Sequence, residues 1–437
     1  MQQKKKMSES ARLAKNEKIK QNGIKTRARR SKMKVSVVDL KIVSNKMSRK
    51  QKEALTRMLL EYKWIRNSAI ANSRFDNEFL AELNGEVSVK TPTGFEQRKI
   101  EFLGSQARQA LMSILRSNLK TLSSLKNKGR KVGRLKFSKE CRSIDLPQYK
   151  RTYELYPNTS GKLNKARIQN VPGRLRVRGF EQLNVEGIEF ANAKLVRRAD
   201  GFHLLVTTFR PKTTTPTTGK IGVDFGIKTQ FSLSDGCEFN FVFEEPERLR
   251  LLHKKLSRQK KGSNGYKTTQ QKIIREYERL SNRKNEQANQ FVHKLTNDNI
   301  VYFQDENISS WRCRNSGSRG SKKIHHGIMG RVKDRLRASE NAVMLPKSVA
   351  TTAWCPACGN RTKHSLNKRI FKCGFCAYSA DRDLHAATNM ILLGERLFTS
   401  GTEGCAGGGS ARLPSSLYEP VKRPPVKPET SCASDEP

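Results

Sequence analysis

The sequence Cys355-Pro-Ala-Cys358, followed after fourteen residues by Cys373-Gly-Phe-Cys376, determines the fold of the last third of the chain. Two Cys-x-x-Cys knuckles at this spacing are typical of a structural zinc site with four thiolate ligands, here Cys355, Cys358, Cys373 and Cys376. Gly359 and Gly374 suit the tight turns that aim backbone N–H groups at sulfur. The alternative is a chance pair of reduced motifs, which the matched spacing disfavours.

The segment directly after the second knuckle has helical spacing. Ala386, Ala387, Met390 and Leu393 recur at intervals of three or four residues. This pattern predicts a helix with Asp383 in its first turn, where the helix dipole favours a carboxylate.

Upstream, residues 220–226 predict a strand with a carboxylate on one face. Ile221, Val223 and Phe225 share the apolar face. Asp224 lies on the other face, between Gly222 and Gly226. We expect these glycines to let a phosphate backbone and a metal ion approach the strand closely. Stretches beginning at Phe231 and spanning 238–243 predict the next two strands of a meander.

A third acidic group follows the apolar strand predicted at 300–304, where Asp305 and Glu306 are adjacent. Asp224, Glu306 and Asp383, at strand ends and a helix start, predict a two-metal phosphodiesterase centre. Mg²⁺ is held by few carboxylates, and a pair of such ions activates water and stabilises the leaving oxygen. Each acid taken alone also fits a turn residue or a helix cap.

The N-terminal half has a different character. A strand is predicted at 35–43, then a capping box from Ser48 to Gln51 and helices over about 55–69 and 105–125. Short β-rich stretches between 134 and 210 predict a small β-barrel, and the Thr/Pro-rich segment 211–218 predicts a linker.

The net positive charge limits the classes of binding partner expected for this 437-residue chain. It has 86 Lys plus Arg against 40 Asp plus Glu, a net charge of +46. Such an excess calls for a polyanion, with nucleic acid favoured over a membrane surface or polyphosphate. The chain has no run of 18 apolar residues and no leader-like apolar stretch after Met1, so we expect no membrane span, no secretion and a cytoplasmic, nucleoid-associated protein.

The charge is unevenly distributed along the chain. Residues 1–34 hold 13 basic and 2 acidic residues and predict a flexible basic arm or a charged helix. Residues 35–399 hold 69 basic and 33 acidic residues, so most of the excess belongs to the folded body. Residues 400–437, with 4 basic and 5 acidic residues among glycines and prolines, predict a disordered tail.

The remaining cysteines and a histidine pair have blander interpretations. Cys141, Cys237, Cys313, Cys405 and Cys432 lack knuckle spacing and are predicted to be free thiols. His325 and His326 could be metal ligands, but a solvated pair in a basic loop is the favoured interpretation.

Taken together, these motifs resemble a known family. The 221–226 strand, the strand-end Glu306 and the double-knuckle ribbon leading into Asp381-Arg-Asp-x-x-Ala-Ala-x-Asn-Met390 resemble the TnpB proteins of bacterial insertion sequences, which are related to compact type V CRISPR effectors. The resemblance covers about 35–400. The ribbon and Asp383 block matches specifically, whereas the N-terminal half matches in pattern.

The resemblance implies an α+β multidomain fold. A β-barrel wedge domain with a helical insertion would precede an RNase H-like, RuvC-type α/β nuclease with an inserted zinc ribbon. The implied boundaries are a basic arm at 1–34, a wedge domain at 35–218 with the helical recognition domain at about 48–128, a nuclease at 219–350 and 378–399, a ribbon at 351–377 and a tail at 400–437.

The resemblance also implies an RNA-guided DNA endonuclease. A guide RNA would pair with one strand of double-stranded target DNA beside a short motif that is read as duplex. Asp224, Glu306 and Asp383 would be catalytic and hold Mg²⁺, as two ions in the family's manner, while the four cysteines would hold structural Zn²⁺. His385 stands where the family commonly has Asn, and a one-residue slip would exchange Asp305 and Glu306.

Two other function classes stay open from the sequence. One is a nucleic-acid-binding accessory or regulatory protein of a transposon with an inactive nuclease centre, which the presence of all three acids argues against. The other is a strand-joining transposase, but no Tyr-centred histidine cluster is present. A metal-dependent cleavage assay separates the first alternative from an endonuclease.

Overall fold

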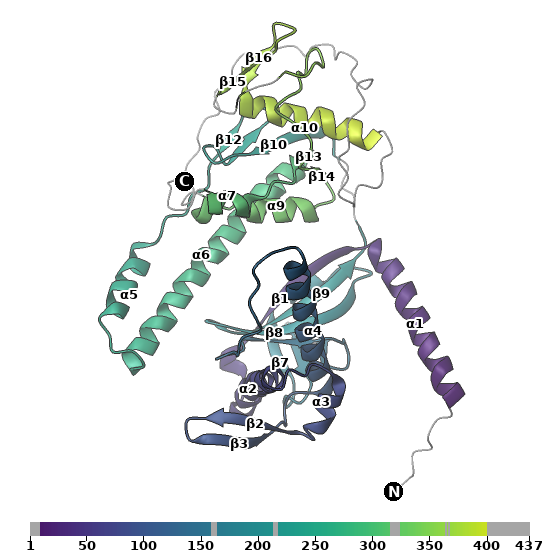
Figure 1. The fold of residues 1–437 in the computed structure, drawn as a ribbon, viewed down its shortest axis with the longest axis vertical. Coiled ribbons are helices and arrows are strands. Elements are labelled where there is room, and N and C mark those ends of the chain that lie inside the picture. The colour runs from purple at the N-terminus through teal and green to yellow at the C-terminus, as the bar shows by residue number, and fades with distance from the viewer. Residues whose placement is uncertain are drawn as a thin grey trace. The chain divides into compact units, whose positions relative to one another are not determined.

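The computed structural model describes residues 9–158, 164–212, 217–314, 324–362, 365 and 368–399 (Figure 1). The chain divides into two compact units, Met1–Lys212 and Thr213–Pro437. Each unit has an apolar core of its own. The predicted tail at 400–437 lies outside the described residues.

Seven antiparallel strands form the main sheet of the first unit, in the order β4-β8-β9-β1-β7-β6-β5. Alternation along each strand separates the core from the solvent: in β7, Leu175 and Val177 are buried, whereas Arg176 and Arg178 are exposed. The strands are β1 (Lys34–Ile42), β4 (Ser143–Leu146), β5 (Tyr153–Tyr156), β6 (Lys165–Ile168), β7 (Leu175–Arg178), β8 (Glu189–Arg198) and β9 (Gly201–Arg210).

This sheet is a nearly closed barrel, because its two edge strands approach each other. Tyr149, just after β4, bridges to Tyr153 at the start of β5. The Tyr149 ring also lies 4.8 Å from the ring of Phe190 in β8, and the Tyr153 hydroxyl donates a 2.9 Å hydrogen bond to the carbonyl of Ala191. The β-rich stretches between 134 and 210 therefore form barrel strands, as their alternation predicts.

Helices α2 (Arg49–Ala71) and α4 (Ser105–Asn127) share one core with the barrel. The predicted capping box is confirmed: Ser48 Oγ accepts from the Gln51 amide at 3.2 Å, and Gln51 Oε1 accepts from the Ser48 amide at 3.0 Å. Between the two helices lie α3 (Asn77–Glu82) and the hairpin of β2 (Glu86–Thr91) and β3 (Gly94–Lys99).

The basic segment before β1 is a helix over its described part. Helix α1 (Glu9–Ser31) is largely exposed, and Arg29 and Arg30 near its end form ion pairs with Glu189 at 2.7 and 3.1 Å. Of the two predicted alternatives, a charged helix describes residues 9–31.

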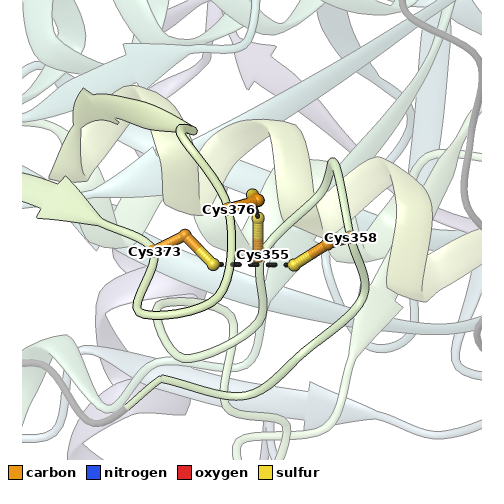
Figure 2. A group of neighbouring side chains, drawn as sticks. All are labelled: Cys355, Cys358, Cys373 and Cys376. Atoms are coloured by element: carbon orange, nitrogen blue, oxygen red, sulfur yellow. Dashed lines mark hydrogen bonds between the residues drawn. The ribbon is translucent and has the colours of Figure 1, made fainter.

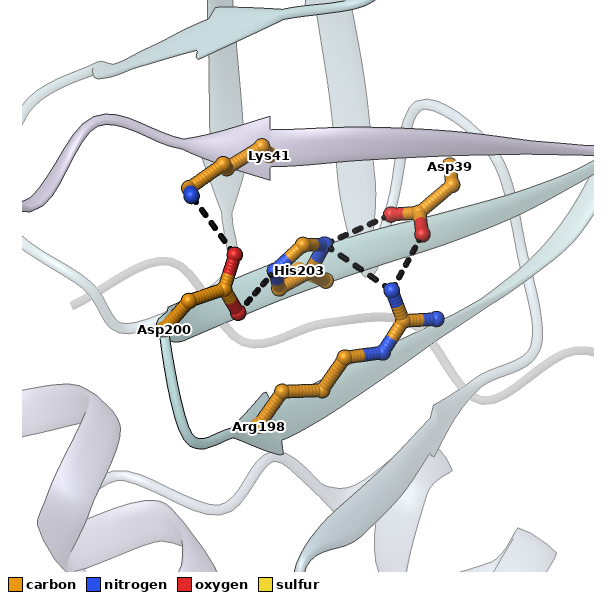
Figure 3. Close-up of polar contacts among 5 residues, drawn as sticks. All are labelled: Asp39, Lys41, Arg198, Asp200 and His203. Carbon is orange, nitrogen blue, oxygen red and sulfur yellow. Dashed lines mark hydrogen bonds and ion pairs between the residues drawn. The ribbon is translucent and has the colours of Figure 1, made fainter. Parts of the chain in front are cut away.

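A buried histidine links β1 to the β8–β9 hairpin (Figure 3). Both ring nitrogens of His203 face carboxylates, with Nδ1 2.8 Å from Asp39 and Nε2 2.9 Å from Asp200. Arg198 also bonds Asp39, and Lys41 bonds Asp200. Burial alone would lower the pKa of His203, but the hydrogen bonds and charges of the two aspartates outweigh it and raise the pKa above 6.5.

The sheet of the second unit has the order β12-β11-β10-β13-β14 and is part parallel. Strands β10, β13 and β14 run parallel, whereas β11 and β12 continue from β10 as an antiparallel meander. The strands are β10 (Gly219–Phe225), β11 (Phe231–Leu233), β12 (Glu238–Phe239), β13 (Asn299–Gln304) and β14 (Ala342–Leu345).

The predicted strand at 238–243 is wrong beyond Phe239. The Phe241 amide donates to the Gln230 side chain at 3.1 Å, and the Phe243 amide donates to the His326 carbonyl at 3.2 Å. Both phenylalanine rings pack against the apolar core instead of extending the sheet. Their aromatic spacing therefore reflects burial and not a strand.

Helices cover both faces of this sheet (Figure 1). Apolar side chains of α6 (Asn264–Thr296) and α9 (Met329–Ala338) pack with the odd-numbered face of β10, and α10 (Arg382–Thr399) packs on the other face. The remaining elements are α5 (Glu247–Ser257), which pairs with α6 as a hairpin, α7 (Ile308–Arg314), and the ribbon strands β15 (Ile370–Lys372) and β16 (Ser379–Asp381).

Within the described part of the chain, every helix is too short or too polar to cross a membrane.

Candidate functional site

The parallel strands bring two of the three predicted acids to one edge of the sheet. Val223 of β10 pairs with Phe303 of β13, so both strands reach that edge together. Asp224 is the next residue of β10, and Glu306 lies two residues beyond the end of β13. Carboxyl ends of parallel strands are where α/β sheets place ligand-binding side chains.

Helix α10 brings Asp383 to the same edge by packing against the glycine side of β10. A Cβ at Gly222 would lie 1.8 Å from the Ala387 carbonyl oxygen, so the helix is seated directly on the strand. Asp383 is one helical turn before Ala387, in the first turn of α10 as predicted. Further along the helix, Glu395 pairs with Lys220 at the start of β10, so α10 runs antiparallel to the strand.

The expectation that the glycines beside Asp224 leave room for a phosphate backbone is wrong. The Ala387 carbonyl fills the space at Gly222, and the Thr229 carbonyl oxygen would lie 2.5 Å from a Cβ at Gly226. Both glycines serve close packing within the protein, and only Asp224 itself faces the site.

The other two carboxylates act on Asp224. Burial is the largest cause that raises the pKa of Asp224, to about 7, and the negative charges of Asp383 and Glu306 raise it further. Arg382 and the Phe225 amide act in the opposite direction. Oxygen ligands from three elements that repel one another without a cation are the donor chemistry that suits Mg²⁺.

This group of acids is looser than the cysteine cluster. Among the described residues, only the four cysteines form a group of three or more His, Cys, Asp or Glu side chains whose ligand atoms all lie within 4.8 Å of one another. Asp383 is instead held by two arginines: Arg369 donates to Oδ2 at 3.1 Å, and Arg382 donates to Oδ1 at 2.9 Å. Asp381 caps the helix by accepting from the Asp383 amide at 2.8 Å.

The two neighbouring acids after β13 have different environments. Asp305 forms ion pairs with Lys333 and Arg337 at 2.6 and 2.7 Å, and these hydrogen bonds lower its pKa despite partial burial. Glu306 is the one whose charge acts on Asp224. A register in which Asp305 replaces Glu306 therefore has no support in the geometry.

The four knuckle cysteines converge on one point (Figure 2). Their sulfurs are paired at 3.7 Å for Cys355 and Cys376 and at 3.5 Å for Cys358 and Cys373. A tetrahedron with metal–sulfur bonds of about 2.3 Å has edges of roughly 3.8 Å, so the cluster could bind zinc. Gly359 has φ +74°, which explains the first knuckle glycine. Gly374 does not adopt the left-handed conformation, and its amide donates to the Thr362 hydroxyl at 3.2 Å.

Two side chains of α10 connect the ribbon to the helix: His385, which the sequence marked only as a departure from the family pattern, and Asn389, which it did not single out. Asn389 is fully buried and donates 2.7 Å hydrogen bonds to the carbonyls of Thr351 and Trp354. His385 stacks on Phe371 of the ribbon at 3.8 Å and bonds Asn389 at 3.1 Å. His385 therefore packs beneath the ribbon, in place of the family's asparagine. Its spacing of four residues from Asn389 is the signal that could have found this pair.

Arg369 and Lys333 were also missed. Arg369 precedes β15 yet reaches Asp383, and Lys333 of α9 reaches the Glu306 carbonyl as well as Asp305. In a chain with 86 basic residues, single cations carry no distinguishing signal. Cys141 and Cys237, which form no disulfide, lie outside the cluster, as expected. His326 bonds the Phe243 carbonyl through Nδ1 at 3.0 Å. Cys405 and Cys432 lie outside the described residues, as does the side chain of Cys313.

Two family models match segments that contain two of the three acids and the cysteine cluster. Residues 203–302 match a model described as a probable transposase (OrfB_IS605), and residues 337–390 match the Cas12f1-like TNB domain. The first includes Asp224, and the second includes the cysteine cluster and Asp383. In both segments the chain is similar to the TnpB family.

Two curated relatives match this chain over part of their length. One from Streptomyces pristinaespiralis, named as a candidate RNA-guided DNA endonuclease, is 29% identical over 41% of this chain and 46% of its own. InsQ of Escherichia coli, with a similar name, is 23% identical over 47% of this chain and 56% of its own. The chain thus spans about half the length of these two relatives.

A solved structure titled as a complex of Cas12f1 with sgRNA and target DNA also matches. The alignment covers 82% of this chain and 98% of that chain at 15% identity, with a TM-score of 0.22.

Proposed function

We propose that this protein is an RNA-guided DNA endonuclease. The carrying observation is the convergence of Asp224, Glu306 and Asp383 at one sheet edge, where the charges of the other two raise the pKa of Asp224. The similarity to the TnpB family and the names of the two curated relatives support the same activity.

The nuclease centre is proposed to be of the RuvC type and to depend on Mg²⁺. The three carboxylates would hold the metal, and two bound ions would supply an activated water and stabilise the leaving oxygen of the phosphodiester. The protein's own contribution is positioning. The strand register sets Asp224 against the end of β13, and the contact of α10 with Gly222 sets Asp383 beside it.

Arg369 and Arg382 balance the charge of this centre. Both guanidinium groups bond Asp383 directly. They hold this carboxylate in place before a cation arrives, since otherwise three acids would repel one another at the same edge. Arg369 comes from the ribbon, so the ribbon takes part in presenting Asp383.

Guide RNA and double-stranded target DNA are the proposed partners. The net charge of +46 suits the phosphate lattice of an RNA scaffold and a heteroduplex, which binds with counterion release. Base pairing would read the target sequence, while the protein reads duplex geometry and a short adjacent motif. The barrel unit would serve as the wedge domain with its helical insertion, and the second unit as the nuclease with its structural zinc ribbon.

The test is to purify the protein, sequence the small RNA that accompanies it and supply a matching DNA duplex. Cleavage should require Mg²⁺, the RNA and the matching sequence, and Asp224→Ala should abolish cleavage while guided binding persists. A protein that binds RNA and DNA but never cuts under any divalent cation would point to the inactive accessory class.

A further inference from the structure

The second unit contains a cavity of about 670 Å³ whose lining differs chemically from the acidic sheet edge. It is bounded by the α5–α6 hairpin, the start of α7 and the segment 324–331. Part of its wall is apolar and includes Leu249, Leu280 and Ile328. The polar side chains on its described wall are those of Lys284 and Arg331, three hydroxyl residues, His325 and His326, and Glu245, and the function proposed above uses none of them.

Lys284 of α6 is the first of these cations. Its side chain lines the cavity, and only 7% of the residue is exposed. Its ammonium donates one hydrogen bond, of 3.2 Å, to the His325 carbonyl, and no carboxylate lies within 4.0 Å of it in the described residues. A buried ammonium normally pairs with an acid because desolvation is costly, so this one lacks the usual counter-charge.

Arg331 of α9 is the second cation, and it is held rigidly. Its Nε donates to Asn285 at 2.9 Å and its Nη2 donates to Ser281 at 3.0 Å, both on α6. These partners are neutral, and they fix the guanidinium plane within one turn of Lys284 along α6. Burial is the larger cause that lowers the pKa of Lys284, and the nearby positive charge of Arg331 lowers it further.

Other titratable groups around the cavity do not neutralise this pair. Glu245 is the acidic residue among those lining the described wall, and it is exposed. Tyr277 contributes a hydroxyl that bonds His253 at 3.1 Å, and the remaining hydroxyl on the wall beside Ser281 belongs to Ser309. Phe243 lies 6.0 Å from the Lys284 ammonium and supplies only a weak cation–π contact.

We propose that this cavity binds a phosphate group, with Lys284 and Arg331 as its charged donors. A tetrahedral anion would accept the unused N–H groups of both cations and remove the cost of their burial. The hydroxyls of Ser281 and Ser309 would complete the set of donors. The volume exceeds that of one phosphate and leaves room for the sugar or base attached to it.

Two sources share this chemistry: a phosphodiester of a bound nucleic-acid strand, or a free phosphate or mononucleotide. The inference rests on the proposed function only in naming nucleic acid as one source. The test therefore reads occupancy of the cavity and not cleavage, so that the two proposals can fail separately.

The experiment uses the full chain and pyridoxal 5′-phosphate, which carries both a phosphate and an aldehyde. The Lys284 amine adds to the aldehyde with loss of water, borohydride reduces the imine to a secondary amine, and peptide mass spectrometry quantifies the modification at each lysine. Inorganic phosphate is the first competitor and a short single-stranded RNA is the second. Lys272, exposed on the same helix, is the internal control.

Phosphate should slow modification of Lys284 about tenfold and that of Lys272 less than about twofold. Protection by both competitors supports a site that accepts the free group, and protection by RNA alone supports a site for backbone phosphate. Arg331→Gln should raise the phosphate concentration needed for protection about tenfold, whereas Arg275→Gln on α6 should leave it unchanged. No modification of Lys284, or modification that neither competitor affects, overturns the proposal.

Discussion

Asp305 and Glu306 are adjacent carboxylates whose partners separate their roles. Asp305 is occupied by Lys333 and Arg337, while the charge of Glu306 reaches Asp224. A strand turns its side chains alternately, and the chain leaves β13 at Gln304, so neighbours here point to different surroundings. Sequence reasoning preferred Glu306 only by resemblance, because alternation alone does not tell which neighbour faces the site.

We expect Glu306→Gln to lower the guided cleavage rate by roughly a thousandfold, equivalent to about 4 kcal/mol. The amide keeps the shape of the side chain but loses the charge that would hold a metal ion. Asp305→Asn is the matched control, and it should change cleavage less than about threefold while costing about 1 kcal/mol of stability. Single-turnover cleavage at saturating Mg²⁺ measures both. An inactive Asp305→Asn beside an active Glu306→Gln would exchange the two assignments.

His203 gives a pH-dependent prediction for the barrel unit. Its pKa in the folded protein is raised above 6.5, so the protonated ring stabilises the fold fully below about pH 6.5, and this contribution is lost as pH rises through the raised value. His203→Gln should therefore cost about 2 kcal/mol near pH 6 and less in alkaline solution. The pKa of Asp39 and Asp200 is lowered, because bonds to His203 and the flanking cations outweigh burial, so their contribution is lost on acidification.

Amide hydrogen exchange in β1 and β9, compared between wild type and His203→Gln across this range, measures the effect. A difference in opening free energy that grows with rising pH would mean that the ring is neutral in the folded state.

At the scale of elements, the sequence predicted the main pieces and missed the contacts between them. Ala386, Ala387, Met390 and Leu393 are all buried, as their helical spacing indicates. From the sequence, Gly222 was expected to leave room for a phosphate backbone and a metal ion. A glycine near an acid gives the same sequence pattern whether a ligand or a helix fills the space beside it. Only the tertiary structure distinguishes the two, by placing the Ala387 carbonyl there.

Gly222→Ala should separate α10 from β10. The added Cβ would lie 1.8 Å from a backbone oxygen that cannot rotate away, so we expect a loss of about 3 kcal/mol of stability. Cleavage should fall about a hundredfold, because Asp383 moves with its helix. Gly330→Ala on α9 has nothing within 4 Å of its Cβ and is the control, expected to leave stability unchanged or slightly raised. Thermal unfolding and cleavage of both variants decide whether this contact seats the helix.

Cys358→Ser tests the ribbon as a support for the acidic edge. We expect the zinc content to fall from one ion per chain toward zero and cleavage to fall with it, because Arg369 and Asn389 connect the ribbon to α10. Cys237→Ser, at a half-buried thiol outside the cluster, should change neither. Elemental analysis alongside cleavage measures this, and unchanged zinc in Cys358→Ser would refute the ligand assignment.

At the scale of the whole molecule, charge and architecture act together. Residues 35–399 hold most of the excess positive charge, spread over both units. Binding that neutralises six to ten phosphates should weaken by roughly 10³ to 10⁵ between 50 and 200 mM salt. Variants of the acidic edge should keep this salt dependence, since the carboxylates are proposed to hold metal ions and not nucleic acid.

Helix α10, which the proposed site needs, is followed by residues 400–437, whose composition is different. Leu393 is 2% exposed and packs with Tyr302, Leu345 and Met390, so a chain ending at residue 392 should lose guided cleavage together with the seat of Asp383. A chain ending at Thr399 keeps all of α10 and should cleave near the wild-type rate, because residues 400–437 hold 4 basic and 5 acidic residues and few apolar ones. Cleavage and retained guide RNA are measured for both truncations. If residues 400–437 bind the guide RNA, they would do so through Lys422, Arg423 and Lys427. A loss of RNA in the Thr399 truncation would show that this segment binds the guide.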